Sequence, residues 1–362
     1  MAVSENQIRN VLAEFIDPYL GKSWPEAKVI KSLEIEDNRL LLTVELGYPC
    51  SGIIPQWIAE LTAKLEKECN LSEARISIQI KIPTYKTTAQ QPLSEVKNII
   101  AVASGKGGVG KSTTAVNLAL ALKKEGANVG ILDADIYGPS LPIMLGSQGM
   151  RPESKDNKTI EPLMRYGLQS MSIGYLVEPE QAVVWRGPMA SGALQQLIND
   201  TQWQQLDYLV VDLPPGTGDI QLTLSQKVPV SAALIVTTPQ DIALADARKG
   251  IGMFEKVDIP VLGIVENMST HICSNCGHED AIFGDGGGAK LAEETGVNLL
   301  GKLPLDRNIR EQTDSGCPTV ENDPDSKITA AYVELARHCA AQLVNLAAQQ
   351  TQSPLSITEV DD

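Results

Sequence analysis

A glycine-rich stretch with two lysines is the part of the sequence whose residue types point most directly to chemistry. Residues 105–113 read Gly-Lys-Gly-Gly-Val-Gly-Lys-Ser-Thr and fit the phosphate-loop pattern G-x-x-x-x-G-K-[ST] at every fixed position. Glycines let backbone N–H groups converge on phosphate oxygens, and a following helix adds partial positive charge at its N-terminus. We expect Lys111 to reach the β- and γ-phosphates and the Ser112 hydroxyl to bind Mg²⁺. The residues expected to contact the nucleotide are Gly105, Lys106, Gly107, Gly108, Val109, Gly110, Lys111, Ser112 and Thr113.

Acidic side chains follow two further apolar runs that are typical of buried strands. Asp133 and Asp135 come directly after residues 128–132, and Asp212 ends the next clear strand. Carboxylates at the carboxyl ends of parallel strands lie where ligands bind in such sheets. We expect Asp135 to position an attacking water or to hold Mg²⁺ through water, although a helix N-cap is an alternative. Asp212 should hold Mg²⁺, mainly through a water, and Gly216 in the next loop could donate its N–H to the γ-phosphate.

The second chemical feature is a pair of cysteines three residues apart. Cys273 and Cys276 make half of a thiolate metal site, because a metal usually takes four ligands. A second copy of the chain would complete four thiolates across a two-fold axis, which suits a [4Fe–4S] cluster. His271 and His278 flank the pair and could instead complete a zinc site. A redox dithiol is the third alternative.

Strands and helices alternate from Val96 onward, so the elements that position these residues should form a mostly parallel α/β sheet. We expect this domain to span residues 96–348. An α-β-β-α-β order predicts a separate small α+β domain over residues 1–84, joined by a polar linker at 85–95. Residues 349–362 are polar and acidic and should form a disordered tail.

The first element of the small domain is predicted from apolar residues at helical spacing. The face includes Ile8, Leu12, Phe15 and Ile16, and Pro18 should end the helix. Composition adds limits: the chain of 362 residues has a formal net charge of −15, which disfavours nucleic-acid binding. No apolar run approaches about 20 residues, so we expect no membrane span, and the start lacks a signal peptide, so we expect a cytoplasmic protein.

Lys106, the second lysine of the loop, makes the loop resemble the deviant Walker A loop of the MinD, ParA and nitrogenase-iron-protein group. The motifs at 133–140, 212–219 and 266–269, together with the cysteine pair, look like those of the Mrp/ApbC family of iron–sulfur carrier P-loop ATPases. The match covers about residues 96–345. The small domain resembles the assembly-related domain often found ahead of these ATPases, with Cys50 after the second strand in a structural or docking role.

The resemblance implies an ATP-hydrolysing homodimer. It places Lys106 on the nucleotide of the partner subunit, gives Lys106, Lys111 and Asp135 catalytic roles, and puts a [4Fe–4S] cluster on Cys273 and Cys276 of both subunits. It also implies an adenine pocket, whose residues are Asn267, Pro304 and Asp306.

The leading hypothesis is therefore a carrier that receives a cluster, responds to ATP and Mg²⁺, and passes the cluster to apo iron–sulfur proteins together with assembly factors. A positioning ATPase like MinD or ParA, with a zinc or redox cysteine pair, is the alternative. That class needs a membrane-seeking tail or a basic DNA-facing surface, whereas the tail here is acidic and the net charge is negative. A small-molecule phosphotransferase is a third hypothesis, without an obvious acceptor motif.

Overall fold

The computed structural model describes residues 3–85, 93–156, 158–177, 187–218, 221, 228–273 and 275–352. Most of the expected linker, at 86–92, and the end of the expected tail, at 353–362, lie outside the described residues. The last helix continues to Gln352, so the expected tail is wrong for its first four residues. No helix among the described residues is long and apolar enough to cross a membrane.

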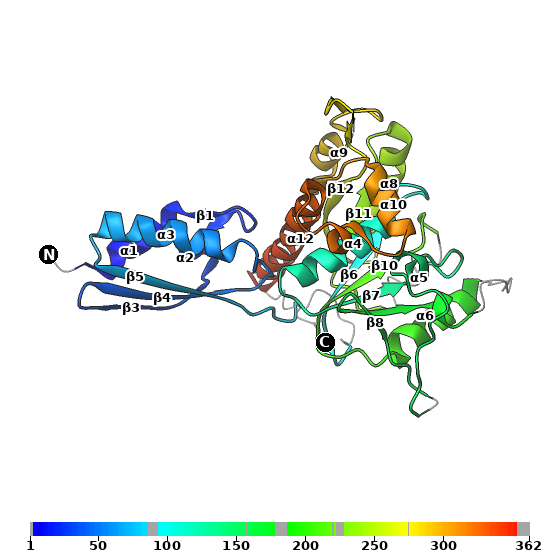
Figure 1. The fold of residues 1–362 in the computed structure, drawn as a ribbon, viewed down its shortest axis with the longest axis horizontal. Helices are drawn as coiled ribbons and strands as arrows, with labels where there is room; N and C mark the ends of the chain where they lie inside the picture. Colours follow the sequence, from blue (N-terminus) through cyan, green and yellow to red (C-terminus); the bar gives the residue numbers. More distant parts are fainter. Residues whose placement is uncertain are drawn as a thin grey trace, which may run out of the picture.

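The small domain is a three-stranded sheet with helices over one face (Figure 1). The sheet order is β3-β4-β5, in which β3 and β4 form an antiparallel hairpin and β4 and β5 run parallel. The elements are α1 (Glu5–Glu14), β1 (Ile16–Asp17), β2 (Lys22–Ser23), α2 (Trp24–Ala27), β3 (Ile30–Glu36), β4 (Arg39–Leu46), α3 (Ile54–Cys69) and β5 (Glu73–Ile80).

Helix α1 ends earlier than the apolar spacing predicts. Its last residue is Glu14, and Ile16, expected on the buried helix face, lies in β1 with 52% of its surface exposed. The buried Asp17 carboxylate accepts hydrogen bonds from the N–H groups of Tyr19 (2.9 Å) and Leu20 (3.0 Å). Pro18 also requires extended backbone at the residue before it. The helix therefore ends before this turn instead of continuing through Ile16.

The large domain is built on an eight-stranded sheet whose order is β15-β12-β11-β6-β10-β7-β9-β8. Every pairing is parallel except that of β8 with β9, as expected for a mostly parallel α/β sheet. The strands are β6 (Val96–Ala103), β7 (Val129–Asp133), β8 (Leu163–Arg165), β9 (Leu168–Ser172), β10 (Leu206–Asp212), β11 (Ala232–Thr237), β12 (Val261–Glu266) and β15 (Leu299–Lys302).

Two layers of helices enclose this sheet, each over its own cluster of buried apolar residues. Helices α4 and α12 contribute to one cluster and α6, α8 and α9 to the other, which explains the near-continuous burial of the strands between them. The helices are α4 (Lys111–Lys124), α5 (Leu141–Met144), α6 (Gly187–Asp200), α8 (Asp241–Lys256), α9 (Gly287–Thr295), α10 (Arg307–Asp314), α11 (Thr319–Asn322) and α12 (Lys327–Gln352).

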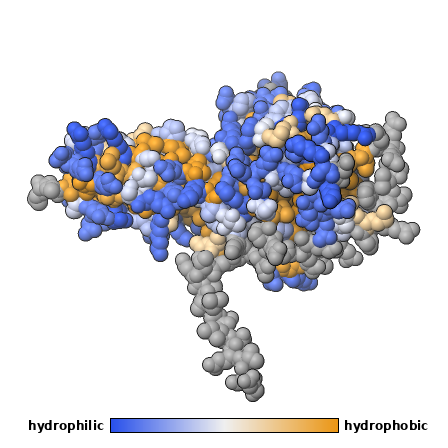
Figure 2. Space-filling view, turned by 90° about the horizontal axis from the view of Figure 1, so that it is seen from below, coloured by the Kyte–Doolittle hydropathy of each residue, from blue (hydrophilic) through white to orange (hydrophobic). Residues whose placement is uncertain are grey.

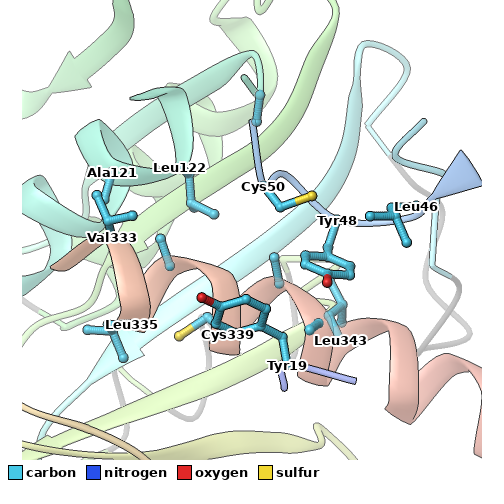
Figure 3. Close-up of a cluster of buried hydrophobic side chains, with 14 of the residues drawn as sticks. Tyr19, Leu46, Tyr48, Cys50, Ala121, Leu122, Val333, Leu335, Cys339 and Leu343 are labelled. Atoms are coloured by element: carbon cyan, nitrogen blue, oxygen red, sulfur yellow. The ribbon is translucent and has the colours of Figure 1, made fainter. Parts of the chain in front are cut away.

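The small domain packs against the α4 and α12 side of the large domain, and the two share one apolar cluster (Figure 3). Around it, Arg337 of α12 donates from Nε to Glu125 Oε2 (2.9 Å), and the Ser51 N–H donates to the Glu125 carbonyl (3.1 Å). Cys50 is fully buried here, and burial is the main cause that raises the pKa of its thiol. On the face of the molecule drawn in Figure 2, most coloured residues are hydrophilic, and hydrophobic residues gather over the small domain.

Candidate nucleotide and thiolate sites

The phosphate loop connects β6 to α4, as the sequence predicts. The loop runs from Ser104 to Gly110, and Lys111 is the first residue of the helix. Gly110 has a φ of +80°, and a Cβ on this residue would overlap the amide of Asn267, so the position requires glycine twice over. That amide donates from Nδ2 to the Val109 carbonyl (2.8 Å), which fixes the loop to the end of β12.

Lys111 and Asp212 form a buried ion pair below the loop. The Lys111 ammonium contacts Asp212 Oδ1 and also lies 3.2 Å from the Ser112 hydroxyl oxygen. Burial is the main cause that raises the pKa of Asp212, and the Lys111 charge opposes it. Lys111, Ser112 and Asp212, which are expected at the phosphates and Mg²⁺, therefore lie together. Phosphate oxygens would compete with Asp212 for Lys111.

Asp133 organises the loop that follows β7. Its carboxylate accepts hydrogen bonds from the N–H groups of Asp135 (3.1 Å), Ser140 (2.9 Å) and Leu141 (3.0 Å), and from the Ser172 hydroxyl (3.1 Å). Burial and then the neighbouring Asp212 charge raise the pKa of Asp133 to about 7. Asp133 thereby holds the backbone of Asp135, whose own pKa is raised mainly by burial.

Gly216 makes a different hydrogen bond from the one expected for it. Its N–H donates to the Ser104 carbonyl at the start of the phosphate loop (2.9 Å), and its φ is +102°. For this N–H to bind a γ-phosphate, the loop after β10 must therefore break its hydrogen bond to the Ser104 carbonyl. In the phosphate loop, Lys106 is half-buried, and its backbone carbonyl accepts a hydrogen bond from the Ser104 hydroxyl (2.9 Å).

The segments expected around the adenine lie side by side after β12 and β15. The Ser269 N–H donates to the Leu303 carbonyl (3.0 Å), and the Leu305 N–H donates to the Thr270 carbonyl (2.8 Å). This pairing brings the Asn267 segment next to residues 304–306. Pro304 lies in the second segment, and Asp306 caps α10 by accepting from the Asn308 N–H (2.7 Å). The Asn267 amide is already bound to the phosphate loop, so its contact with a base would come from its remaining groups.

The cysteine pair lies at the tip of a short antiparallel hairpin formed by β13 (His271–Ile272) and β14 (Glu279–Asp280). The Cys273 N–H donates to the His278 carbonyl, and the Gly277 N–H donates to the Cys273 carbonyl, both at 2.8 Å. Cys273 is half-buried and Cys276 is exposed. The backbone N–H groups of Asn275 and Cys276 are the main causes that lower the pKa of Cys273, which favours the thiolate that metals bind.

A third ligand does not join the two thiols from within the described part of one chain. Among the described residues, no group of three or more His, Cys, Asp or Glu side chains is placed to hold a metal ion. His271 Nδ1 lies 3.0 Å from the Leu305 carbonyl oxygen, which leaves its Nε2 as the ring nitrogen that could bind a metal. In the described residues the zinc alternative with both histidines is not assembled, whereas half-buried Cys273 and exposed Cys276 lie together on the hairpin.

Two family models match this chain, one over each domain. Residues 95–340 match the family model described as NUBPL iron-transfer P-loop NTPase, and residues 5–82 match that of an iron-sulfur cluster assembly protein. A relative from Escherichia coli K12, named iron-sulfur cluster carrier protein, is 52% identical over 337 residues, which cover 93% of this chain and 91% of the relative.

Two solved structures resemble the large domain. A nucleotide-binding protein from Archaeoglobus fulgidus in complex with ADP is 39% identical, with a TM-score of 0.56, over 62% of this chain and 88% of its own. The cell division ATPase MinD from Pyrococcus furiosus is 26% identical, with a TM-score of 0.51, over 67% of this chain and 97% of its own. These similarities confirm the predicted P-loop NTPase fold of the MinD type.

Proposed function

The chain belongs to the family of iron-transfer P-loop NTPases, and from this premise we propose that it is an ATP-hydrolysing carrier of a [4Fe–4S] cluster. In this proposal two identical chains hold the cluster between them and deliver it to apo iron–sulfur proteins, in concert with cluster assembly factors. Its relative in Escherichia coli bears the name iron-sulfur cluster carrier protein, which supports the cargo.

The observation that carries the proposal is the incomplete thiolate site. Two cysteines on an exposed hairpin supply two ligands, and no third candidate stands beside them in the described residues. A [4Fe–4S] cluster is held by four cysteine thiolates. Two copies related by a two-fold axis supply four, and the lowered pKa of Cys273 favours the ligating form.

The nucleotide half of the proposal assigns one task to each expected site residue. Ser112 and Asp212 would hold Mg²⁺, and Lys111 would bind the β- and γ-phosphates. Asp135 would orient a water whose oxygen attacks the γ-phosphorus while the bond to the ADP oxygen breaks, giving ADP and phosphate. Lys106 would act on the nucleotide of the partner subunit, and Asn267, Pro304 and Asp306 would line the adenine.

Cysteine variants test the cargo without touching the nucleotide site. Cys273→Ala and Cys276→Ala should each abolish iron and sulfide retention after purification without oxygen, because each variant leaves a dimer only two of the four thiolates. Nucleotide binding should be unchanged in both variants. His278→Ala is the matched control, and it should keep the full iron and sulfide content.

Three results would overturn the proposal. The first is normal iron and sulfide in either cysteine variant. The second is a colourless wild-type protein that contains stoichiometric zinc. The third is loss of metal in His278→Ala, which would point to the zinc alternative.

A further inference from the structure

The cysteine hairpin is fastened to the segment expected to line the adenine. His271 begins β13, two residues before Cys273, and its Nδ1 lies 3.0 Å from the Leu305 carbonyl oxygen. The two residues also form a parallel β-bridge, and the Leu305 N–H donates to the Thr270 carbonyl (2.8 Å). Leu305 lies between Pro304 and Asp306, so the hairpin and these two residues share one piece of backbone.

The other connections of the hairpin also lead back to the nucleotide loops. On its N-terminal side, Asn267 is bound to Val109 of the phosphate loop (2.8 Å). On its C-terminal side, the Gly288 N–H at the start of α9 donates to the buried Glu266 carboxylate at the end of β12. The segment that carries the cysteines is therefore held on both sides to the end of β12, beside the phosphate loop.

His271 supplies a side-chain contact of the hairpin with residues 304–306, whereas His278 is exposed and its backbone carbonyl accepts a hydrogen bond from the Cys273 N–H. The two histidines thus flank the same cysteines but face different surroundings. The difference makes them a natural pair for comparison.

We propose that His271 is a positioning residue that couples nucleotide occupancy to the placement of Cys273 and Cys276. Adenine binding restrains residues 304–306, and the His271 ring transmits that restraint to the hairpin. The inference rests on the proposed function for the roles of the base pocket and of the thiols. Coupling between sites is reciprocal, so occupancy of the thiols changes nucleotide affinity by the same factor.

Alkylation of the cluster-free protein tests the coupling without any iron. Iodoacetamide modification of the peptide that contains both cysteines is followed by mass spectrometry, with and without saturating Mg-ADP, and nucleotide occupancy is measured separately. Because the His271 side chain adds about one hydrogen bond to the backbone contacts at Leu305, nucleotide should slow the modification about fivefold more in the wild type than in a variant without that side chain. His271→Ala should therefore show a clearly smaller slowing, which need not vanish because the bond from the Leu305 N–H to the Thr270 carbonyl remains.

Two variants separate positioning from a merely structural role. His271→Asn places an amide donor near the position of Nδ1 and should restore the nucleotide effect. His278→Ala should keep it. The inference is overturned if nucleotide has no effect in the wild type, if His271→Ala keeps the full effect, or if His278→Ala loses it. Iron content, measured on separate samples, reports on the proposed function alone, so the two can fail independently.

Discussion

The phosphate-loop end of the large domain and the cysteine hairpin differ in how completely one chain satisfies them. At the phosphate loop, Lys111 and Asp212 are buried against each other, and Asp133 accepts four hydrogen bonds from its surroundings. At the hairpin, Cys276 is exposed, and the described residues offer the two thiols no third ligand. In the described residues, the buried polar groups of the phosphate-loop region are paired within one chain, whereas the two thiols of the hairpin have no third ligand beside them.

In the proposed function, this difference assigns nucleotide binding to one chain and cluster binding to two. Buried polar groups are stable only when they are paired, so the phosphate-binding end must be formed by folding alone. The exposed hairpin does not bury unpaired polar groups, so it can fold with two thiols that have no metal bound. The contrast suggests that nucleotide binding is a property of the monomer fold, whereas cluster binding is a property of the assembly.

Thiol reactivity should show the largest difference between interior and hairpin. Cys50 and Cys339 are fully buried, and burial raises the pKa of both thiols, so alkylation requires opening of the structure. We expect both to react at least about 10³-fold more slowly than exposed Cys276. Denaturant should remove the difference. Equal rates in the native protein, by mass spectrometry, would show that the buried thiols are as accessible as Cys276.

Removing one partner of a buried charge should cost far more stability than removing one on the surface. Arg337→Ala leaves the Glu125 carboxylate buried without its guanidinium and should lower the free energy of unfolding by about 3–5 kcal/mol. Arg310→Ala is the matched control, because the Arg310–Asp314 pair is exposed and should contribute about 0–1 kcal/mol. Urea unfolding measures both, and similar losses would contradict the account.

Loss of Lys111 should separate the two regions by activity. Lys111→Ala removes the charge that would bind the phosphates and should lower the rate of ATP hydrolysis by about 10²–10³-fold. Cluster content after reconstitution should stay at the wild-type level, because the hairpin is built by other residues. Lys124→Ala, at the exposed end of the same helix, is the control and should hydrolyse ATP normally. Loss of iron from Lys111→Ala would show that cluster retention depends on the phosphate-loop region.

The smallest expected effect concerns the contact between β12 and the phosphate loop. Asn267→Ala removes the hydrogen bond to the Val109 carbonyl and should weaken nucleotide binding about tenfold. Asn267→Asp keeps the shape of the side chain but lacks the Nδ2 donor, so it should weaken binding at least as much. Isothermal titration with Mg-ADP measures both affinities, and an unchanged value in either variant would remove this contact from the account.

Local pattern was enough to predict the phosphate loop and the strands around it. Every fixed position of the loop motif is present, and the apolar runs that end in Asp133 and Asp212 form adjacent parallel strands. The end of α1 was predicted two residues too late, because apolar spacing continues through Ile16 while the Asp17 turn is set by tertiary burial. The C-terminal helix likewise extends further than polarity suggested.

Contacts between distant parts of the sequence escaped prediction. The His271 contact with Leu305 spans 34 residues, and nothing in the spacing distinguishes His271 from His278. The hydrogen bond from Gly216 to Ser104 and the junction around Glu125 and Arg337 are equally non-local. Such pairings depend on how the sheet brings strand ends together, which residue types alone do not specify.

The mass and iron content of the cluster-loaded protein distinguish a cluster shared by two chains from one held by a single chain. Protein reconstituted without oxygen should elute in light-scattering chromatography as a dimer with four irons per two chains. Chelation of the iron should remove the colour and leave each chain able to bind nucleotide. A monomer that retains the full iron and sulfide content of a cluster would contradict the account.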